Sequence, residues 1–390
     1  MPGFLYLTAA LGASPKGEFF SPAIRRTIAK RNAGKGRHLT SQGTDDRQLR
    51  LGPVAIDFPV VQAALSGYSD WPMRVIARRF GAAYTVCEVM LDRFIVNVSK
   101  GRKAKRFLRV TDEEHPCGAQ LMGSVPDEFP PAALKLVEAG FDVIDLNFAC
   151  PVKKVLGRCR GGFLMSDPAT ALQIVARVRD ALPPHIPLTI KLRRGMDESA
   201  ESRDRFFTIF DGSFSLGIVA ATVHGRTVRQ RYEGVSSREF LREVKLHAGS
   251  RTVLGSGDLF TPRDCLDMLR ETGVDGVSVA RGAIGNPWIF RQARALAAGV
   301  VLPPPTLHEQ REVIAEHYRL SEQIYGPSRC CRVMRKFGIK YARLHPEHQA
   351  VREAFVAVTK PADWRAALDR WYAEDLPGVT PPPPIDGYYE

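Results

Sequence analysis

The stretch Val143-Ile144-Asp145-Leu146-Asn147-Phe148-Ala149-Cys150-Pro151 decides the fold class that we assign to this chain. Its first half is a short apolar run of the kind that forms a buried strand. The run then stops, and an amide, a thiol and a proline follow within a few residues. Loops at strand ends carry functional groups on a rigid scaffold. We therefore expect a buried strand that presents Cys150 at its end.

The same pattern of apolar run, polar or glycine-rich turn and amphipathic helical stretch recurs from Phe58 to about Phe290. Strands are expected at Val60–Ala64, Tyr84–Glu88, Gly118–Leu121, Val143–Leu146, Leu188–Leu192, Val219–Val223, Thr252–Leu254 and Gly276–Val279. Helices are expected between most of them, for example at Met73–Phe80, Pro130–Ala139, Pro168–Leu182, Arg238–Ala248 and Pro262–Thr272. Eight such units in roughly 230 residues fit a TIM (β/α)8 barrel better than an open doubly wound sheet. No G-x-G-x-x-G follows the first strand, which further weakens the dinucleotide-binding alternative.

Three other parts flank the expected barrel of residues 51–300. Residues 1–50 contain many lysines and arginines among Gly, Ser and Thr, and we expect a basic, disordered extension. After a proline-rich linker, residues 306–376 lack strand signals and are expected to form a small C-terminal helical domain. Its helices are expected at Leu307–Tyr325, Pro327–Leu344, Glu347–Val358 and Ala362–Tyr372. Residues 377–390 are expected to form a proline-rich tail.

The composition limits the class of protein. The chain has 390 residues, of which 44% are hydrophobic and 25% charged, as in ordinary soluble proteins. No apolar run approaches the roughly 20 residues that span a bilayer, so we expect no membrane association. Seven cysteines without a C-x-x-C motif indicate reduced thiols in a cytoplasmic protein that binds no metal. A monomer is expected.

The formal net charge of +13 is the first indication of a partner. Such an excess attracts polyanions, above all nucleic acid, through phosphate contacts and counterion release. A soluble basic protein without such a partner is the alternative, so the position of the charge has to decide.

Polar side chains gather at the expected strand ends, which is where a TIM barrel has its active site. They are Gln120, Asn147, Cys150, Lys191, His224, Arg226, Ser256, Asp258 and Arg281. Gly255 and Gly257 allow backbone N–H groups to close on a phosphate, and Arg281 supplies a charged donor beside the helix that follows. A phosphate held by the last two strand-end loops recurs in this fold. For either loop alone, an ordinary strand-to-helix turn is the alternative.

Two of these residues carry specific chemistry. Lys191 ends an apolar run, where an ammonium is costly without an anionic partner. An electron-rich ring or a developing anion is the partner that we expect, and a snorkelling side chain is the alternative. Cys150 is either a small buried hydrophobe or a proton donor that faces a substrate. Cys159 is the rival thiol.

A basic stripe marks the expected helical domain. Arg329, Arg332, Lys336, Lys340 and Arg343 recur at intervals of three and four residues and share one helical face. Cys330, Met334, Phe337, Tyr341 and Leu344 occupy the adjacent face, which we expect to be buried. No acidic residue interrupts the stripe. It predicts a platform for an RNA backbone, with a merely solvated face as the alternative.

The sequence resembles the flavin-dependent tRNA-dihydrouridine synthases, especially the bacterial B-type. The resemblance runs from about Val60 to about Tyr372. It rests on Asp145-Leu146-Asn147 with Cys150-Pro151 and Lys153-Lys154-Val155, on Thr189-Ile190-Lys191-Leu192-Arg193, on His224-Gly225-Arg226-Thr227, on Gly257-Asp258, and on Arg281-Gly282-Ala283-Ile284-Gly285-Asn286-Pro287-Trp288-Ile289-Phe290.

The resemblance implies an enzyme that reduces selected uridines in tRNA to 5,6-dihydrouridine with FMN as cofactor and NADPH as reductant. Hydride would pass from FMN to C6 of uracil, and Cys150 would protonate C5. The implied FMN-binding residues are Ala63, Ala64, Leu65, Gln120, Lys191, His224, Ser256, Gly257, Asp258, Ala280 and Arg281. Asn147 and Arg226 are implied to face the uracil or the flavin edge, and the basic stripe is implied to contact tRNA.

The sequence departs from the family pattern around the expected flavin site. Ala64 and Leu65 stand where the family has Pro and Met, Ser256 replaces Asn, and Ala149 and Ala280 replace Gly. Two alternatives therefore stay open. One is an FMN-dependent oxidoreductase of a small molecule, and the other is a catalytically degenerate tRNA-binding paralogue.

Overall fold

The computed structural model describes residues 48–99 and 101–381, which belong to one compact unit. Residues 1–47, which make up nearly all of the expected basic extension, lie outside the described residues. So do residues 382–390 of the expected tail.

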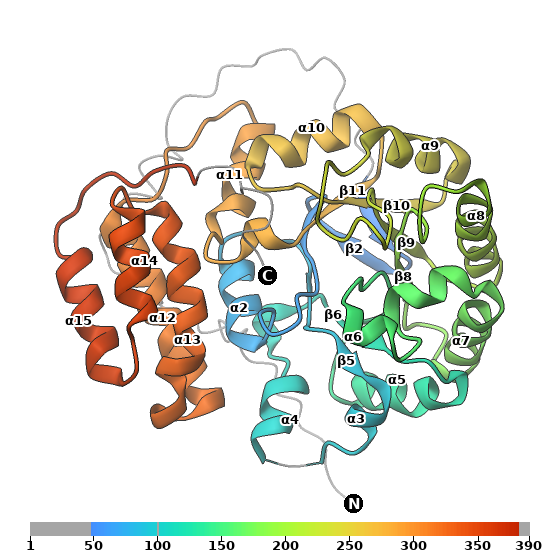
Figure 1. Ribbon diagram of the computed structural model, residues 1–390, viewed down its shortest axis with the longest axis horizontal. Coiled ribbons are helices and arrows are strands. Elements are labelled where there is room, and N and C mark those ends of the chain that lie inside the picture. Colours follow the sequence, from blue (N-terminus) through green and yellow to red (C-terminus); the bar gives the residue numbers. More distant parts are fainter. Residues whose placement is uncertain (1–47, 100, 382–390) are drawn as a thin grey trace, which may run out of the picture. The chain divides into compact units, whose positions relative to one another are not determined.

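Eight parallel strands close into a barrel (Figure 1). They are β3 (Val60–Gln62), β4 (Thr85–Val86), β6 (Cys117–Met122), β7 (Val143–Phe148), β8 (Leu188–Arg193), β9 (Ala220–His224), β10 (Thr252–Ser256) and β11 (Gly276–Val279). The ring closes because β3 pairs with β11 on one side and with β4 on the other, and β4 pairs with β6. A short strand, β5 (Met90–Leu91), pairs with the end of β6. The predicted TIM barrel is confirmed.

Helices surround the barrel, as the amphipathic stretches predict. The larger ones are α2 (Trp71–Arg79), α5 (Phe129–Glu138), α7 (Pro168–Ala181), α8 (Ala200–Ser215), α9 (Arg238–Ala248), α10 (Pro262–Thr272) and α11 (Trp288–Ala297); α3 (Asp92–Val96), α4 (Gly101–Phe107) and α6 (Lys153–Leu156) are short. Several begin at a side chain that accepts an N–H of the first turn, such as Asp167 in α7 and Thr261 in α10. Such caps satisfy donors that a helix leaves unpaired.

An antiparallel hairpin of β1 (Leu49–Leu51) and β2 (Val54–Ile56) precedes the barrel. It begins inside the segment expected to be an extension. Leu49, Leu51 and Ile56 are buried in one cluster with Val143 and Ala220, the first residues of β7 and β9. The hairpin therefore closes the end of the barrel opposite the carboxyl ends of the strands.

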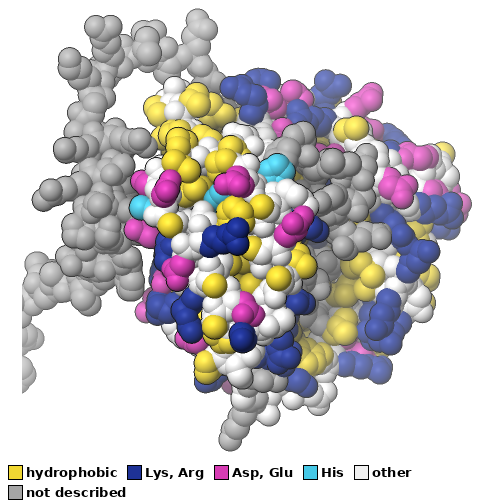
Figure 2. Space-filling view, turned by 60° about the vertical axis from the view of Figure 1, so that its left-hand side comes forward, with side chains coloured by type: hydrophobic (Ala, Val, Ile, Leu, Met, Phe, Trp, Pro, Cys, Tyr) yellow, Lys and Arg dark blue, Asp and Glu magenta, His cyan; other side chains and the backbone are white. Residues whose placement is uncertain are grey.

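The predicted C-terminal helical domain is present as α12 (Leu307–Tyr325), α13 (Pro327–Tyr341), α14 (His348–Val356) and α15 (Pro361–Trp371). The expected apolar face of α13 is buried, with Cys330, Met334 and Phe337 at 0% exposure. Arg79 on α2 pairs with Glu316 on α12 at 2.7 Å, so the helical domain packs directly on the barrel. Its surface carries Lys and Arg side chains mixed with acidic and hydrophobic ones (Figure 2).

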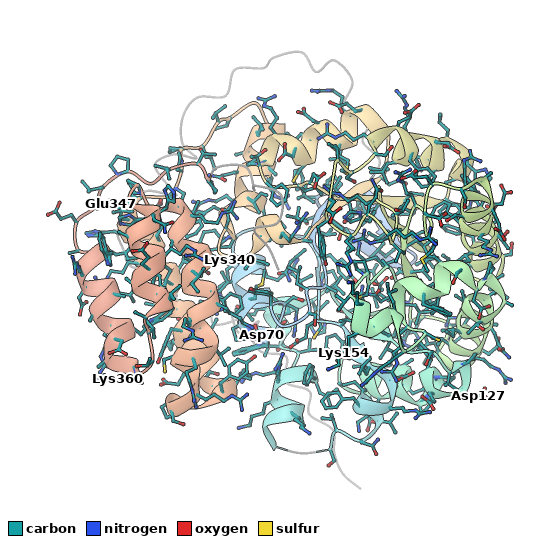
Figure 3. The ribbon with its side chains drawn as sticks, in the orientation of Figure 1. Asp70, Asp127, Lys154, Lys340, Glu347 and Lys360 are labelled. Carbon is teal, nitrogen blue, oxygen red and sulfur yellow. The ribbon has the colours of Figure 1, made fainter. Side chains whose placement is uncertain are left out.

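Asp70 and Lys340 lie where α13 meets the barrel (Figure 3). The approach is closest at Gly285, where an added Cβ would lie 2.5 Å from the main chain of Lys340 and of Tyr341. Its φ of +70° is also a conformation that favours glycine. Gly285 therefore permits close packing of the last barrel loop against α13.

Candidate active site

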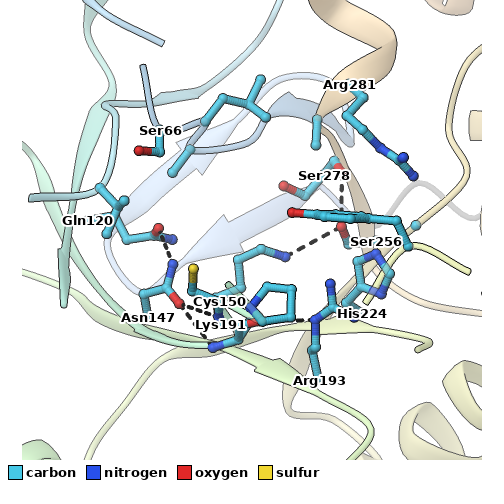
Figure 4. Close-up of a pocket in the computed structure, with 18 of the residues that line it drawn as sticks. Ser66, Gln120, Asn147, Cys150, Lys191, Arg193, His224, Ser256, Ser278 and Arg281 are labelled. Atoms are coloured by element: carbon cyan, nitrogen blue, oxygen red, sulfur yellow. Dashed lines mark hydrogen bonds between the residues drawn. The ribbon is translucent and has the colours of Figure 1, made fainter. Parts of the chain in front are cut away.

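A pocket opens at the carboxyl ends of the barrel strands (Figure 4). Twelve of the residues that the sequence predicts for the site line it: Ala64, Leu65, Gln120, Asn147, Cys150, Lys191, His224, Ser256, Gly257, Asp258, Ala280 and Arg281. Ala63 and Arg226 are buried and do not line this pocket. The parallel register explains the gathering, since Asn147 pairs with Lys191, and Ser256 with His224, on neighbouring strands.

A chain of hydrogen bonds runs from the barrel interior to the Cys150 loop. Asp145 accepts from Thr189 Oγ1 and from Gln120 Nε2, both at 2.6 Å. Asn147 Nδ2 donates to Gln120 Oε1 at 2.6 Å, and Asn147 Oδ1 accepts the backbone N–H of Cys150 at 3.0 Å. The orientation of Asn147 and the entry to the loop are therefore set by groups inside the barrel.

Cys150 is half-buried at the pocket wall. Burial raises the pKa of its thiol above the ordinary 9.0, although the backbone N–H of Val152 and the charge of Arg193 act in the opposite direction. The thiol is therefore protonated at neutral pH, as a proton donor must be. Cys159, the rival thiol, is exposed and is not among the pocket-lining residues.

Lys191 brings a cation into the pocket wall. Desolvation lowers the pKa of its ammonium from 10.5 to about 8, and the Asp145 carboxylate opposes this shift. Within the described residues, its ammonium has one hydrogen bond, to Ser256 Oγ at 3.4 Å. A buried ammonium whose desolvation is offset by so few hydrogen bonds is suited to an anionic or electron-rich ligand.

His224 stands beside this cation at the end of β9. Its pKa is held well below 6.5 by desolvation and by the charges of Arg193 and Lys191, among others. Its Nδ1 accepts the backbone N–H of Arg226 at 3.1 Å. The ring is thus neutral at neutral pH, and Nε2 carries the proton that it can donate.

The loop after β10 turns on two residues with positive φ, Gly257 at +116° and Asp258 at +52°. A Cβ added at Gly257 would lie 2.2 Å from Ser236 Oγ, so the main chain there has room only for glycine. Arg226 donates to Asp258 Oδ2 at 2.8 Å, and Arg281 lies 3.7 Å from the same carboxylate. Arg226 therefore fixes the loop, and its side chain does not line the pocket.

The sequence reasoning missed Arg193 and Tyr232, which both line the pocket. Arg193 donates to the carbonyl of Ala149 at 2.9 Å and to that of Thr227 at 2.8 Å, and so ties the Cys150 loop to the loop after β9. Alternation along β8 was the available signal: Lys191 and Arg193 are two residues apart and share a face of the strand. Tyr232 lies on a loop, where no such periodicity exists.

The five cations of the stripe differ in their surroundings. Arg329 and Arg332 are exposed on α13. Lys336 is half-buried and donates to the carbonyl oxygen of Gly67 in the barrel. Lys340 and Arg343 are also half-buried, and burial lowers the pKa of Lys340, as do the charges of Arg343, Arg352 and Arg281. The stripe therefore approaches the pocket through Lys340.

With this geometry in view, comparison with known proteins decides the family. A sequence model of the family described as "Dihydrouridine synthase (Dus)" matches residues 61–375. This chain belongs to the dihydrouridine synthase family. The predicted family and its bacterial B-type are confirmed by "tRNA-dihydrouridine synthase B" of Xanthomonas campestris pv. campestris, 33% identical over 86% of this chain and 98% of that protein. The protein of the same name in Shigella flexneri is 30% identical over 83% of this chain and 99% of that protein.

Solved structures support the barrel fold. Histamine dehydrogenase from Rhizobium sp. 4-9 superposes with a TM-score of 0.50 over 74% of this chain and 50% of that chain, at 14% identity. A 2-naphthoyl-CoA reductase gives 0.51 over 65% of this chain and 52% of that chain, at 11% identity. At these identities the similarity concerns the fold alone.

Two features are absent from the described residues. No helix there is long and apolar enough to cross a membrane. In the same residues, no group of three or more His, Cys, Asp or Glu side chains is placed to hold a metal ion.

Proposed function

We propose that this protein reduces selected uridines of tRNA to 5,6-dihydrouridine, with FMN as cofactor and NADPH as reductant. The observation that carries the proposal is that Cys150, Asn147 and Lys191 share one pocket with the Gly257 loop and Arg281. A proton donor, an amide that can bind a base edge, a cation and a glycine turn that can approach a phosphate are the groups that this reaction requires.

The residues present fit FMN. The Gly257 turn has room only for glycine and lines the pocket together with the Arg281 cation, and the Lys191 ammonium has one hydrogen bond among the described residues, to Ser256. Gln120, His224, Ser256, Asp258 and Ala280 would complete the lining, with Ala64 and Leu65 as its cover. When bound there, FMN in its reduced form would supply the hydride for C6 of uracil.

The protein's own groups would do the remaining chemistry. Asn147 is held by Gln120 and can orient a uracil edge beside the Cys150 loop. Cys150 would deliver its Sγ proton to C5 as the C5–C6 double bond is lost. Lys191 would stabilise negative charge that develops next to it. Arg226, which the sequence assigned to the ligand, would act through Asp258 by fixing the phosphate loop.

RNA is the partner that we propose for the helical domain. Arg329 and Arg332 are exposed on α13, and the stripe leads through Lys340 toward Arg281 at the pocket. A target base must leave its stack to reach a thiol inside a barrel, which is easier in the loops of tRNA than in a duplex.

Dihydrouridine mapping tests the proposal. In tRNA from cells that lack the gene, dihydrouridine should disappear from at least one position and return when the gene is restored. An unchanged content at every position would overturn the proposal. The visible spectrum of the purified protein after FMN addition separates the alternatives, because a degenerate RNA-binding paralogue would bind tRNA and show no bound flavin.

A further inference from the structure

Lys336 differs from the other cations of the stripe in what it contacts. Its ammonium donates to the carbonyl oxygen of Gly67, a residue of the first barrel loop. It also lies 4.8 Å from the ring centre of Tyr68 and 5.1 Å from that of Phe337. Arg332, one turn earlier on the same helix, is exposed. Lys336 therefore points toward the barrel and Arg332 toward solvent.

The loop that Lys336 reaches, residues 65–70, forms part of the pocket wall. Leu65 and Ser66 line the pocket directly. The loop is folded on itself, because the Leu65 N–H donates to Ser69 Oγ at 2.8 Å and the Ser69 N–H donates to the Leu65 carbonyl at 3.0 Å. A shift of Gly67 would therefore move the residues that face the ligand.

A second side chain of the helical domain holds the other end of this loop. Tyr325 at the end of α12 donates to Asp70 Oδ2 at 2.6 Å, and Asp70 Oδ1 accepts the N–H of Met73 at the start of α2. Asp70 is 1% exposed. Its carboxylate is therefore shared between a barrel helix and the helical domain.

The barrel holds the same loop from its own side. Glu88 accepts the N–H of Gly67 at 2.9 Å and is paired with Arg106 at 2.7 Å. Gly67 is thus held at both main-chain polar atoms, its N–H by the barrel and its carbonyl by α13. The two carboxylates, Asp70 and Glu88, face two cations, Lys336 and Arg106, and charges buried together in this way are kept only when they are paired.

We propose that Lys336 and Tyr325 are positioning residues that clamp the 65–70 loop of the pocket wall, so that the helical domain shapes the flavin site as well as binding RNA. The inference rests on the proposed function. Lys336 then holds the loop of the pocket wall, and the exposed arginines of α13 bind the RNA phosphates. Binding of RNA to α13 would reach the pocket through this clamp.

The test compares Lys336→Met with Arg332→Met, since both remove one cation from the same helix. Hydrogen exchange of the segment 64–70 should quicken about tenfold in Lys336→Met, the effect of losing one hydrogen bond to a charged group. FMN should bind more weakly to this variant by a similar factor, measured by flavin fluorescence. Arg332→Met should leave the exchange rate and the FMN affinity unchanged. It should reduce the slope of the logarithm of the tRNA binding constant against the logarithm of salt concentration by about the amount of one phosphate contact.

Turnover separates clamping from general destabilisation. Lys336→Met should lower kcat with the KM for tRNA unchanged, whereas Arg332→Met should raise this KM with kcat unchanged. Tyr325→Phe removes the hydroxyl without changing charge, and it should also quicken exchange in the segment 64–70. This variant tests the clamp if Lys336→Met does not fold. Unchanged exchange in the folded variants, or a lower salt dependence of tRNA binding in Lys336→Met with normal FMN affinity, would overturn the clamp. Exchange and FMN binding are measured without RNA reduction, so failure of the clamp is distinguishable from failure of the proposed function.

Discussion

The side-chain oxygen of Asn147 accepts the backbone N–H of Cys150 at 3.0 Å. The amide nitrogen of the same side chain donates to Gln120 Oε1, which is itself held through Asp145. One asparagine thus connects the candidate acid to the barrel interior. The position of the thiol is set by a buried network and not by the loop alone.

Removing this connection should slow the reaction. Asn147→Ala deletes the acceptor of the Cys150 N–H, a bond whose loss costs about 1–3 kcal/mol when the donor is left buried. Single-turnover reduction of tRNA uridine should therefore slow by about 10- to 100-fold. Asn97→Ala is the control, since Asn97 is exposed and its side chain, among the described residues, donates to the carbonyl of Arg93. Equal rates for the two variants would contradict the network's role.

The two thiols near the pocket can be told apart. Cys150→Ala should reduce dihydrouridine formation by about 10²- to 10⁴-fold, the usual contribution of a positioned acid, with flavin reduction by NADPH unchanged. Cys159→Ala should have little effect on either step, because Cys159 is exposed and does not line the pocket. Stopped-flow reduction and nucleoside mass spectrometry measure the two steps separately. Reversed results would assign the proton to Cys159.

Lys191 predicts a pH dependence of stability in the cofactor-free protein. Its pKa in the folded protein is about 8, because desolvation outweighs the Asp145 carboxylate, and the ordinary value is 10.5. Between pH 8 and pH 10.5 the unfolded chain binds the Lys191 proton more readily than the folded protein does. The free energy of unfolding should therefore increase as pH rises. The Tm of the wild type relative to Lys191→Met should increase from pH 8 to pH 10. A flat difference would show that Lys191 titrates normally.

Replacement of Gln62 by an apolar residue should stabilise the protein. Its amide is 0% exposed, and neither of its polar atoms has a partner among the described residues. A buried unpaired amide costs about 1–3 kcal/mol, so Gln62→Met should raise the Tm. Gln120→Met is the control. The oxygen and the nitrogen of the Gln120 amide are both hydrogen-bonded, so this substitution should lower the Tm. A lower Tm for Gln62→Met would show that its amide binds water or a ligand.

Local signals account for what the sequence predicted well. Both ends of α10 match the expectation, because Thr261 caps its start and Gly273 ends it in the left-handed conformation. Strand ends were less accurate: the first barrel strand was expected to reach Ala64 and stops at Gln62. Where a strand ends depends on its neighbours in the sheet, which no local pattern encodes.

The partners of individual charges were the least predictable part of the site. The spacing of Lys336 places it on the basic stripe, yet its acceptor, the carbonyl of Gly67, lies 269 residues away in the chain. Arg226 similarly pairs with Asp258 from a different strand end. Periodicity identifies the face of a helix or strand that a side chain occupies, whereas its partner is fixed only by tertiary packing.

The hairpin of Leu49–Leu51 and Val54–Ile56 has a consequence for the order of events during turnover. Its buried leucines close one end of the barrel, and among the described residues the pocket lined by Cys150 and Arg281 opens at the other end. In the proposed reaction, the reductant and the RNA would reach the site through this same opening, and the first product would leave before the second substrate enters. Double-reciprocal plots of rate against one substrate, at several fixed levels of the other, should therefore be parallel lines.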